Sequence, residues 1–148
     1  MIIRKLSNAI LEQKPYEAWN AFVDLLAEES YQDLNDVQRV AHLCFWYDSE
    51  VQNGGHLQYF ENRGITLLDE TLSALLLLGA ECQHAVLEKV AGLFNSKPRD
   101  RIGTFEEYVA TVTVVNLPRL IQATMLANRL FKSCWRIIWR GIRVILLK

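Results

Sequence analysis

The sequence predicts an all-α fold: a single compact multi-helix domain with a long C-terminal amphipathic helix. Apolar residues recur three and four positions apart along most of the chain, which is the period of an amphipathic helix. Only 7 of the 148 residues are Gly and 3 are Pro, and 51% are hydrophobic, so the chain is neither disordered nor fibrous. A chain of this length can bury a core as one domain.

The first helix is expected near Tyr16–Glu29. Pro15 suits the start of a helix because its missing N–H has no partner there in any case. After Pro15 the apolar residues follow a helical spacing: Trp19, Phe22, Val23 and Leu26. The next helix is expected to begin with Asn35 or Asp36 as its cap. Its buried stripe is Val37, Val40, Ala41, Cys44, Phe45 and Val51.

Glycines divide the middle of the chain into further helices. Gly54-Gly55 is expected to end the helix that starts near Asn35, and a short piece over His56–Asn62 follows. Gly64 stops that piece. Two more helices are expected over Leu67–Leu78 and Glu81–Phe94, with a break at Gly79, and a loop carries Ser96, Pro98 and Gly103.

The stretch from Thr104 to Val115 carries two opposing signals. Thr104 and Glu107 have the spacing of a capping box, which starts a helix. The β-branched run Val109–Val115 favours a strand by propensity. We predict a helix, because a lone strand would have no partner elsewhere in this sequence. The last helix is expected to open at Asn116-Leu117-Pro118 and to run to the chain end.

The charges divide the chain at residue 128. Residues 1–128 hold 10 Lys and Arg and all 17 Asp and Glu, whereas residues 129–148 hold six cations and no acid. We therefore predict an acidic all-helical domain over 1–128 and a basic amphipathic helix over 129–148, part of or appended to the same domain.

Several protein classes are disfavoured by composition. No window reaches the roughly eighteen apolar residues that a membrane span needs, and the N-terminus does not resemble a secretory signal. Cys44, Cys82 and Cys134 are far apart and odd in number, which favours reduced thiols in a cytoplasmic protein over disulfides or a zinc site.

The sequence offers little support for catalysis. It lacks the nucleophile-elbow, phosphate-loop, dinucleotide and zinc-protease motifs, and its histidines have no helical partner of the kind that metal sites use. Asp48 and Glu50 with His56 can be drawn as an acid–base group, but nothing supplies a nucleophile. We therefore expect a non-enzyme without a cofactor or a metal, and interpret Asp48 and Glu50 as surface residues beside a turn.

The most distinctive segment is the corner around Gly54-Gly55. Two successive glycines are expected where a helix ends in a left-handed turn and the backbone passes close to a neighbour. Asn53 can hydrogen-bond the turn, and Gln58 can reach the freed carbonyls. Large aromatic side chains flank the glycines: Trp46, Tyr47, Tyr59 and Phe60. We interpret this segment as a packed helix–turn–helix corner, with a small-ligand site lined by the same aromatics as the alternative.

This corner also carries a family resemblance. Glu50-Val51-Gln52-Asn53-Gly54-Gly55-His56-Leu57-Gln58-Tyr59-Phe60 resembles the signature of a bacterial family of small all-helical domains, the best-described member of which is a DNA-mimic protein. The similarity extends from the Trp19 helix through Gly79-Ala80. The resemblance implies an all-α homodimer, and at least one relative presents carboxylates that occupy the DNA-binding surface of a transcription regulator.

A DNA mimic needs dense rows of exposed carboxylates, because duplex DNA carries one charge per roughly 1.7 Å of its axis. Candidates for an acidic partner-binding surface are Asp24, Glu28, Glu29, Asp33, Asp36, Asp48 and Glu50. Asp69 and Glu70 can add to them. The alternative is that these carboxylates are only the solvated faces of amphipathic helices.

The basic end departs from the acidic ending that the resemblance suggests. On a helix, Arg129, Lys132, Arg136, Arg140 and Arg143 fall within an arc of about 80°, and apolar residues that include Trp135 and Trp139 cover the rest. Such a helix can pack on its own body or on a second subunit, lie on an anionic membrane, or bind nucleic acid. A segment with no selected role is a further alternative.

The leading hypothesis is a non-enzymatic interaction protein that binds a protein partner, such as a DNA-binding regulator, through its acidic helical surface. We do not expect direct nucleic-acid binding, because the acidic body would repel DNA. The alternatives are a peripheral membrane protein that uses the basic C-terminal helix, and a small-ligand binder at the Gly54-Gly55 corner.

Overall fold

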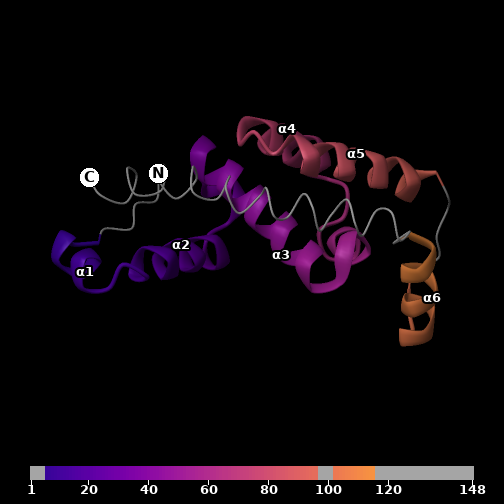
Figure 1. Ribbon diagram of the computed structural model, residues 1–148, viewed down its shortest axis with the longest axis horizontal. Coiled ribbons are helices and arrows are strands. Elements are labelled where there is room, and N and C mark those ends of the chain that lie inside the picture. The colour runs from indigo at the N-terminus through magenta and orange to yellow at the C-terminus, as the bar shows by residue number, and fades with distance from the viewer. Residues whose placement is uncertain (1–5, 97–101, 116–148) are drawn as a thin grey trace.

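The computed structural model describes residues 6–96 and 102–115, and every regular element in these ranges is helical (Figure 1). The all-α prediction is therefore confirmed for this part of the chain. The predicted C-terminal helix, including its opening at Asn116-Leu117-Pro118, lies outside the described residues.

The helices follow one another through short connections. Their bounds are α1 (Asn8–Gln13), α2 (Glu17–Glu28), the short 3-10 helix η1 (Tyr31–Asp33), α3 (Asp36–Arg63), α4 (Leu68–Leu77), α5 (Glu81–Asn95) and α6 (Phe105–Val115). The sequence predicted α2, α4 and α5 within a few residues at each end, and also the start of α6. It predicted two helices that are separated at Gly54-Gly55, whereas the structure has the single kinked helix α3 there. The sequence did not predict α1 or η1.

Capping boxes fix where two of these helices begin. Asn35 caps α3: its Oδ1 accepts from the Gln38 amide at 3.0 Å, while Gln38 Oε1 accepts from the Asn35 amide at 3.0 Å. Thr104 and Glu107 form the predicted capping box before α6, because the Glu107 amide donates to Thr104 Oγ1 at 3.2 Å and the Thr104 amide donates to Glu107 Oε2 at 3.2 Å. The helical prediction for this segment is confirmed over its strand propensity.

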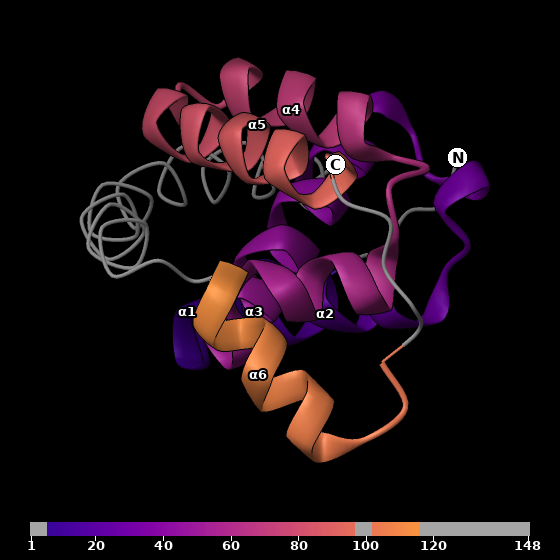
Figure 2. The same cartoon turned by 90° about the vertical axis from the view of Figure 1, so that its right-hand side faces the viewer.

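The long helix α3 is the centre of the fold. Figure 2 shows α4 and α5 side by side in one layer, with α2 and α3 in the layer beneath. On one side α3 packs against α4 and α5 in the main core, whose least exposed members include Cys44, Leu75 and Leu87. On the other side Phe22 and Leu26 of α2 pack against Ala41. Burial of these apolar side chains holds the two layers together.

No helix in the described ranges is both long enough and apolar enough to cross a bilayer.

Candidate functional site

An uninterrupted acidic stretch runs from α2 to the start of α3. No Lys or Arg lies between Lys14 and Arg39, whereas six carboxylates do. We call five of these the acidic segment: Asp24, Glu28, Glu29, Asp33 and Asp36. All are exposed except Glu29, which is half-buried. Asp24 and Glu28 are four residues apart on α2 and therefore project from the same side of the helix.

The described part of the chain is strongly acidic. Sixteen of the 17 carboxylates lie in it, together with four cations: Lys14, Arg39, Arg63 and Lys89. Arg39 is engaged with backbone rather than with acids, since its Nη2 donates to the Gln32 carbonyl at 2.7 Å and its Nε to the Tyr31 carbonyl at 3.3 Å. Arg39, the first cation after the acidic segment in the sequence, is therefore held by backbone carbonyls of η1.

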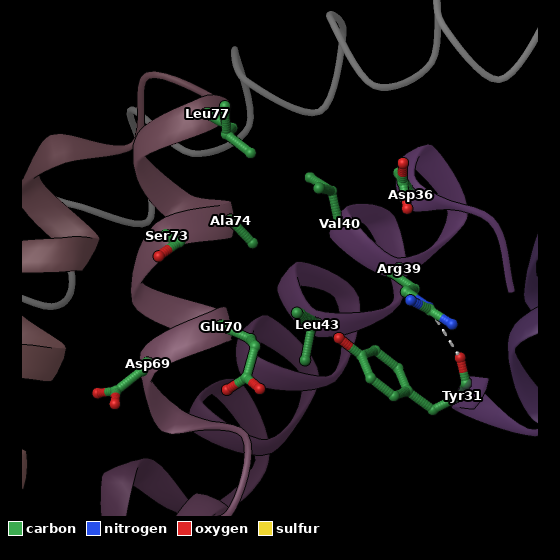
Figure 3. A pocket seen from close by; sticks show the side chains of 10 residues that line it. All are labelled: Tyr31, Asp36, Arg39, Val40, Leu43, Asp69, Glu70, Ser73, Ala74 and Leu77. Atoms are coloured by element: carbon green, nitrogen blue, oxygen red, sulfur yellow. Dashed lines mark hydrogen bonds between the residues drawn. The ribbon is translucent and has the colours of Figure 1, made fainter.

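A cleft of about 340 Å³ between the first part of α3 and the length of α4 extends this acidity (Figure 3). Asp36 of α3 lies at one end of it, and Asp69 and Glu70 of α4 lie at the other, so one cleft is lined by carboxylates of both predicted groups (Figure 3). We call it the α3–α4 cleft, and it is lined by Tyr31, Asp36, Arg39, Val40, Leu43, Asp69, Glu70, Ser73, Ala74 and Leu77.

The α3–α4 cleft combines an acidic rim with an apolar floor. Val40 and Ala74 face each other across it in Figure 3, and Leu43 is drawn between Glu70 and the Tyr31 ring. Burial raises the pKa of the Tyr31 phenol, and the negative charge of Glu70 raises it further, against the opposing effect of Arg39. A phenol that keeps its proton adds no charge, so the negative charge of the rim comes from its carboxylates.

Glu50 does not belong to the exposed acidic surface that the sequence predicted. We expected it to be an exposed carboxylate beside a turn, but it is only 7% exposed. Its Oε2 accepts from Gln58 Nε2 and from Asn62 Nδ2, each at 2.8 Å, and its Oε1 pairs with Arg63 Nε at 3.3 Å. A buried carboxylate needs such donors to offset its lost hydration. Glu50 is therefore a structural residue that a partner cannot reach.

The hydrogen bonds of Glu50 clamp the two halves of α3 together across the glycine corner. Burial by itself raises the pKa of Glu50, but the hydrogen bonds from Gln58 and Asn62 and the charge of Arg63 outweigh it and hold that pKa below its usual value. The Arg63 guanidinium also lies 3.9 Å from the ring centroid of Trp46, a cation–π contact that joins the same two halves.

Gly54 and Gly55 kink α3, whereas the sequence predicted that a helix ends there. Gly55 has φ 77° and ψ −173°, a region that essentially only glycine occupies, so the helix is sharply kinked here. A Cβ on Gly54 would collide with the side chain of Gln58, so this is the close approach that we expected. Gln58 itself binds Glu50. The freed carbonyl of Gly54 accepts from Tyr108 of α6 at 3.2 Å.

The aromatic residues of the corner belong to the core. Tyr59 and Phe60 are buried, and the Tyr59 hydroxyl donates to Thr71 of α4 at 3.2 Å. Trp46 is half-buried, and its Nε1 and the Nδ1 of His42 are buried without a hydrogen-bond partner among the described residues. The packed-corner interpretation accounts for these positions better than a ligand pocket does.

The remaining predicted residues lie apart from the acidic segment or outside the described ranges. Asp48 is half-buried, accepts from Gln52 at 2.6 Å, and lines a second cleft of about 240 Å³ with Trp19, Phe45 and the exposed Asn53. The predicted basic residues are not described: Arg129, Lys132, Arg136, Arg140 and Arg143.

The groups drawn as an acid–base set have separate partners. Asp48 accepts a hydrogen bond from Gln52, and His56 Nε2 lies 3.2 Å from the Tyr47 hydroxyl. Glu50 accepts hydrogen bonds from Gln58, Asn62 and Arg63. The buried His56–Tyr47 pair was not predicted, because a lone histidine between a glycine and a leucine gives no sequence signal for its partner. Within residues 6–96 and 102–115, no group of three or more potential metal ligands comes together.

The fold and these surfaces define a class of protein: a small all-helical domain with an acidic surface and a clamped double-glycine corner. Residues 32–120 match the family model of the DMP19-like proteins, which is more than half of the chain, and the chain therefore belongs to that family. The match includes the double-glycine corner and every residue that lines the α3–α4 cleft except Tyr31. No curated protein and no solved structure matches the chain significantly.

Replacing Gly55 with alanine is expected to destabilise the protein by about 2 kcal/mol, because Ala cannot adopt the backbone conformation found there without strain. Denaturant unfolding of the variant measures the loss. Gly92→Ala is the matched control: Gly92 is an exposed helical residue with open space around it, and this change is expected to stabilise α5 slightly. Equal behaviour of the two variants would contradict the role given to Gly55.

Proposed function

We propose that this protein is a non-enzymatic DNA mimic that binds the DNA-binding surface of a protein partner, such as a transcription regulator, through its acidic segment. The observation that carries the proposal is the density of exposed carboxylates from α2 to the start of α3 with no cation between Lys14 and Arg39. Membership of the DMP19-like family, which includes a DNA-mimic protein, supports it.

The charge pattern suits a surface that binds DNA-binding proteins. A regulator reads duplex DNA with a basic patch, and a large share of its affinity comes from contacts with phosphates. Carboxylates four residues apart on a helix are separated by about 6 Å along its axis, which is sparser than the phosphates of one DNA strand. Several elements must therefore contribute, and η1 and the start of α3 supply Asp33 and Asp36 beside α2.

The homodimer that the resemblance implies is part of this proposal. Two copies of the acidic segment would double the charge that a dimeric regulator meets, since dimeric regulators bind paired half-sites. The mass of the protein in solution, measured by light scattering, tests this element: a mass of 17.1 kDa would contradict it, and twice that mass would support it.

Capture of a DNA-binding protein from cell extract tests the proposal. The full chain is immobilised, and captured proteins are eluted with duplex DNA. We expect a DNA-binding protein that duplex DNA releases and whose capture weakens as salt increases. The triple variant Asp24→Lys/Glu28→Lys/Asp33→Lys should bind this protein at least about tenfold more weakly, because like charges then face each other.

The control variant Glu61→Lys/Glu81→Lys/Glu88→Lys makes the same change of charge at three exposed carboxylates of α3 and α5. It should keep most of the binding. If both triple variants lose binding equally, net charge rather than the acidic segment is responsible. If duplex DNA does not displace the captured protein, DNA mimicry is the wrong mechanism.

A further inference from the structure

The α3–α4 cleft has an apolar surface that no described residue covers. Leu77, on its wall, is 75% exposed, and the neighbouring Leu76 is 50% exposed. A volume of about 340 Å³ is at the lower end of the range for sites that hold a ligand or an anchoring side chain. Isolated exposed leucines are ordinary, but an exposed leucine on the wall of an apolar-floored cleft marks a docking surface.

The rim of the cleft selects a cationic occupant. Asp36, Asp69 and Glu70 make no ion pair within the described part of the chain, and the guanidinium of Arg39 is held by two backbone carbonyls of η1. An occupant that combines large apolar side chains with Arg or Lys one helical turn apart would cover the floor and neutralise the rim.

The chain itself contains such a segment. Residues 129–148 carry six cations and no acid, with Trp135 and Trp139 four residues apart and Arg136 and Arg140 beside them. Apolar anchors at this spacing are typical of a helix that binds in a groove.

The connection is long enough for this segment to reach the cleft of its own molecule. Residues 116–128 separate α6 from Arg129, and an extended chain of that length spans roughly 45 Å. A domain of about 100 residues has a radius of gyration of about 13 Å, so its whole surface lies within that reach. A tethered segment is also present at an effective concentration in the millimolar range, which favours the same molecule over a second copy.

We infer that the basic segment Arg129–Lys148 docks in the α3–α4 cleft of its own molecule. Its apolar side chains cover Val40, Ala74 and Leu77, and its cations pair with Asp36, Asp69 and Glu70. The docked basic segment then neutralises the carboxylates on one side of the acidic domain. Asp36 belongs to both surfaces, but Asp24, Glu28 and Asp33, which the variant that tests partner binding changes, do not line the cleft, so the docked segment and the DNA mimic can fail separately.

Carbodiimide coupling of the full chain tests the docking, since this reagent joins a carboxylate to a lysine amine only where the two are in contact. Lys132 and Lys148 are the amines of the tail. We expect them to couple mainly to Asp36, Asp69 or Glu70, as identified by mass spectrometry of proteolytic fragments. A mixture of isotopically light and heavy protein shows whether each bond lies within one molecule.

Reversing the charge of two arginines in the basic segment gives a second test of the docking. Arg136→Glu/Arg140→Glu keeps both lysines and all cleft carboxylates, and should lower coupling at the cleft at least about fivefold. When Asp69→Lys/Glu70→Lys is combined with Arg136→Glu/Arg140→Glu, the cleft carries the new lysines and the basic segment carries the new carboxylates. Coupling between the two regions should then be restored. Glu81→Lys/Glu88→Lys is the control, because it makes the same change at two exposed glutamates of α5, and it should leave coupling at the cleft unchanged.

The unmodified protein alone can overturn the inference, even if a variant fails to fold. Coupling of Lys132 and Lys148 spread evenly over exposed carboxylates such as Glu88 and Glu106 would show that the tail has no fixed site. Coupling found only between light and heavy molecules would show that the cleft binds the tail of a second copy instead.

Discussion

Replacing Glu50 with alanine is expected to lower the free energy of unfolding by about 3 kcal/mol, which corresponds to a fall in melting temperature of roughly 6–12 °C. The carboxylate of Glu50 is the common acceptor for Gln58, Asn62 and Arg63, so its removal leaves three donors without their partner. This loss is at the lower end of the range for removing one partner of a buried ion pair, because the side chain of Arg63 is 34% exposed and can turn to water. Thermal and denaturant unfolding measure the loss.

Glu61→Ala is the matched control for the clamp. Glu61 lies on the same helix, is exposed, and should tolerate alanine within about 0.5 kcal/mol. Acidification gives a second check with Glu50→Gln. The pKa of Glu50 is lowered in the folded protein, so its contribution is complete above its ordinary value near 4.5 and is lost as the pH falls through the folded-state value. The unmodified protein should therefore lose more stability below pH 4.5 than Glu50→Gln does. If the stability of both proteins falls equally as the pH is lowered, the Glu50 carboxylate does not hold the two halves of α3 together.

The helices that the sequence predicted correctly are those with local signals. Thr104 and Glu107 interact within one helical turn, so a pattern of four residues is enough to place that cap; for α3 the sequence left the cap open between Asn35 and Asp36, and the structure has Asn35 with Gln38. The break at Gly54-Gly55 was predicted for the same reason, because the backbone conformation of Gly55 is available only to glycine.

The features that the sequence did not predict depend on contacts between distant residues or on very short elements. The helix α1 has six residues, too few to show a helical period. Glu50 looks like any carboxylate near a turn, and only the kink brings Gln58, Asn62 and Arg63 back to it. The α3–α4 cleft likewise exists only because α4 packs against α3, which makes Asp36, Asp69 and Glu70 line the same cleft.

The acidic surface was predicted in part. Asp24, Glu28, Asp33 and Asp36 are exposed as expected, since each lies on the polar side of a helix or in a connection. The prediction failed at Glu50, where the helical period alone could not tell a solvated carboxylate from one satisfied by buried donors. Burial of a charged residue depends on its partners, and these follow from the tertiary fold.

Lowering the pH from 6.5 to 4 is expected to destabilise the protein by about 2–3 kcal/mol through His56 alone. Burial lowers the pKa of His56 from 6.5 to about 4, because the charged imidazolium loses its hydration in the core. The unfolded chain then binds a proton that the folded chain excludes, so the stability is complete above pH 6.5 and is lost as the pH falls toward 4. Burial and the charge of Arg63 lower the pKa of His42 to about 4 as well, which adds to the loss in the same range.

Two variants separate this titration from simple loss of a hydrogen bond. His56→Phe removes the titrating group, so the slope of unfolding free energy against pH between 4.5 and 6 should fall by about 1 kcal/mol per pH unit. Tyr47→Phe removes the 3.2 Å contact between Tyr47 and Nε2 but keeps the buried imidazole. Because burial and not Tyr47 lowers the pKa of His56, Tyr47→Phe should lose some stability at every pH and keep the slope. An unchanged slope in His56→Phe would mean that the folded protein takes up the proton at His56 as readily as the unfolded chain does.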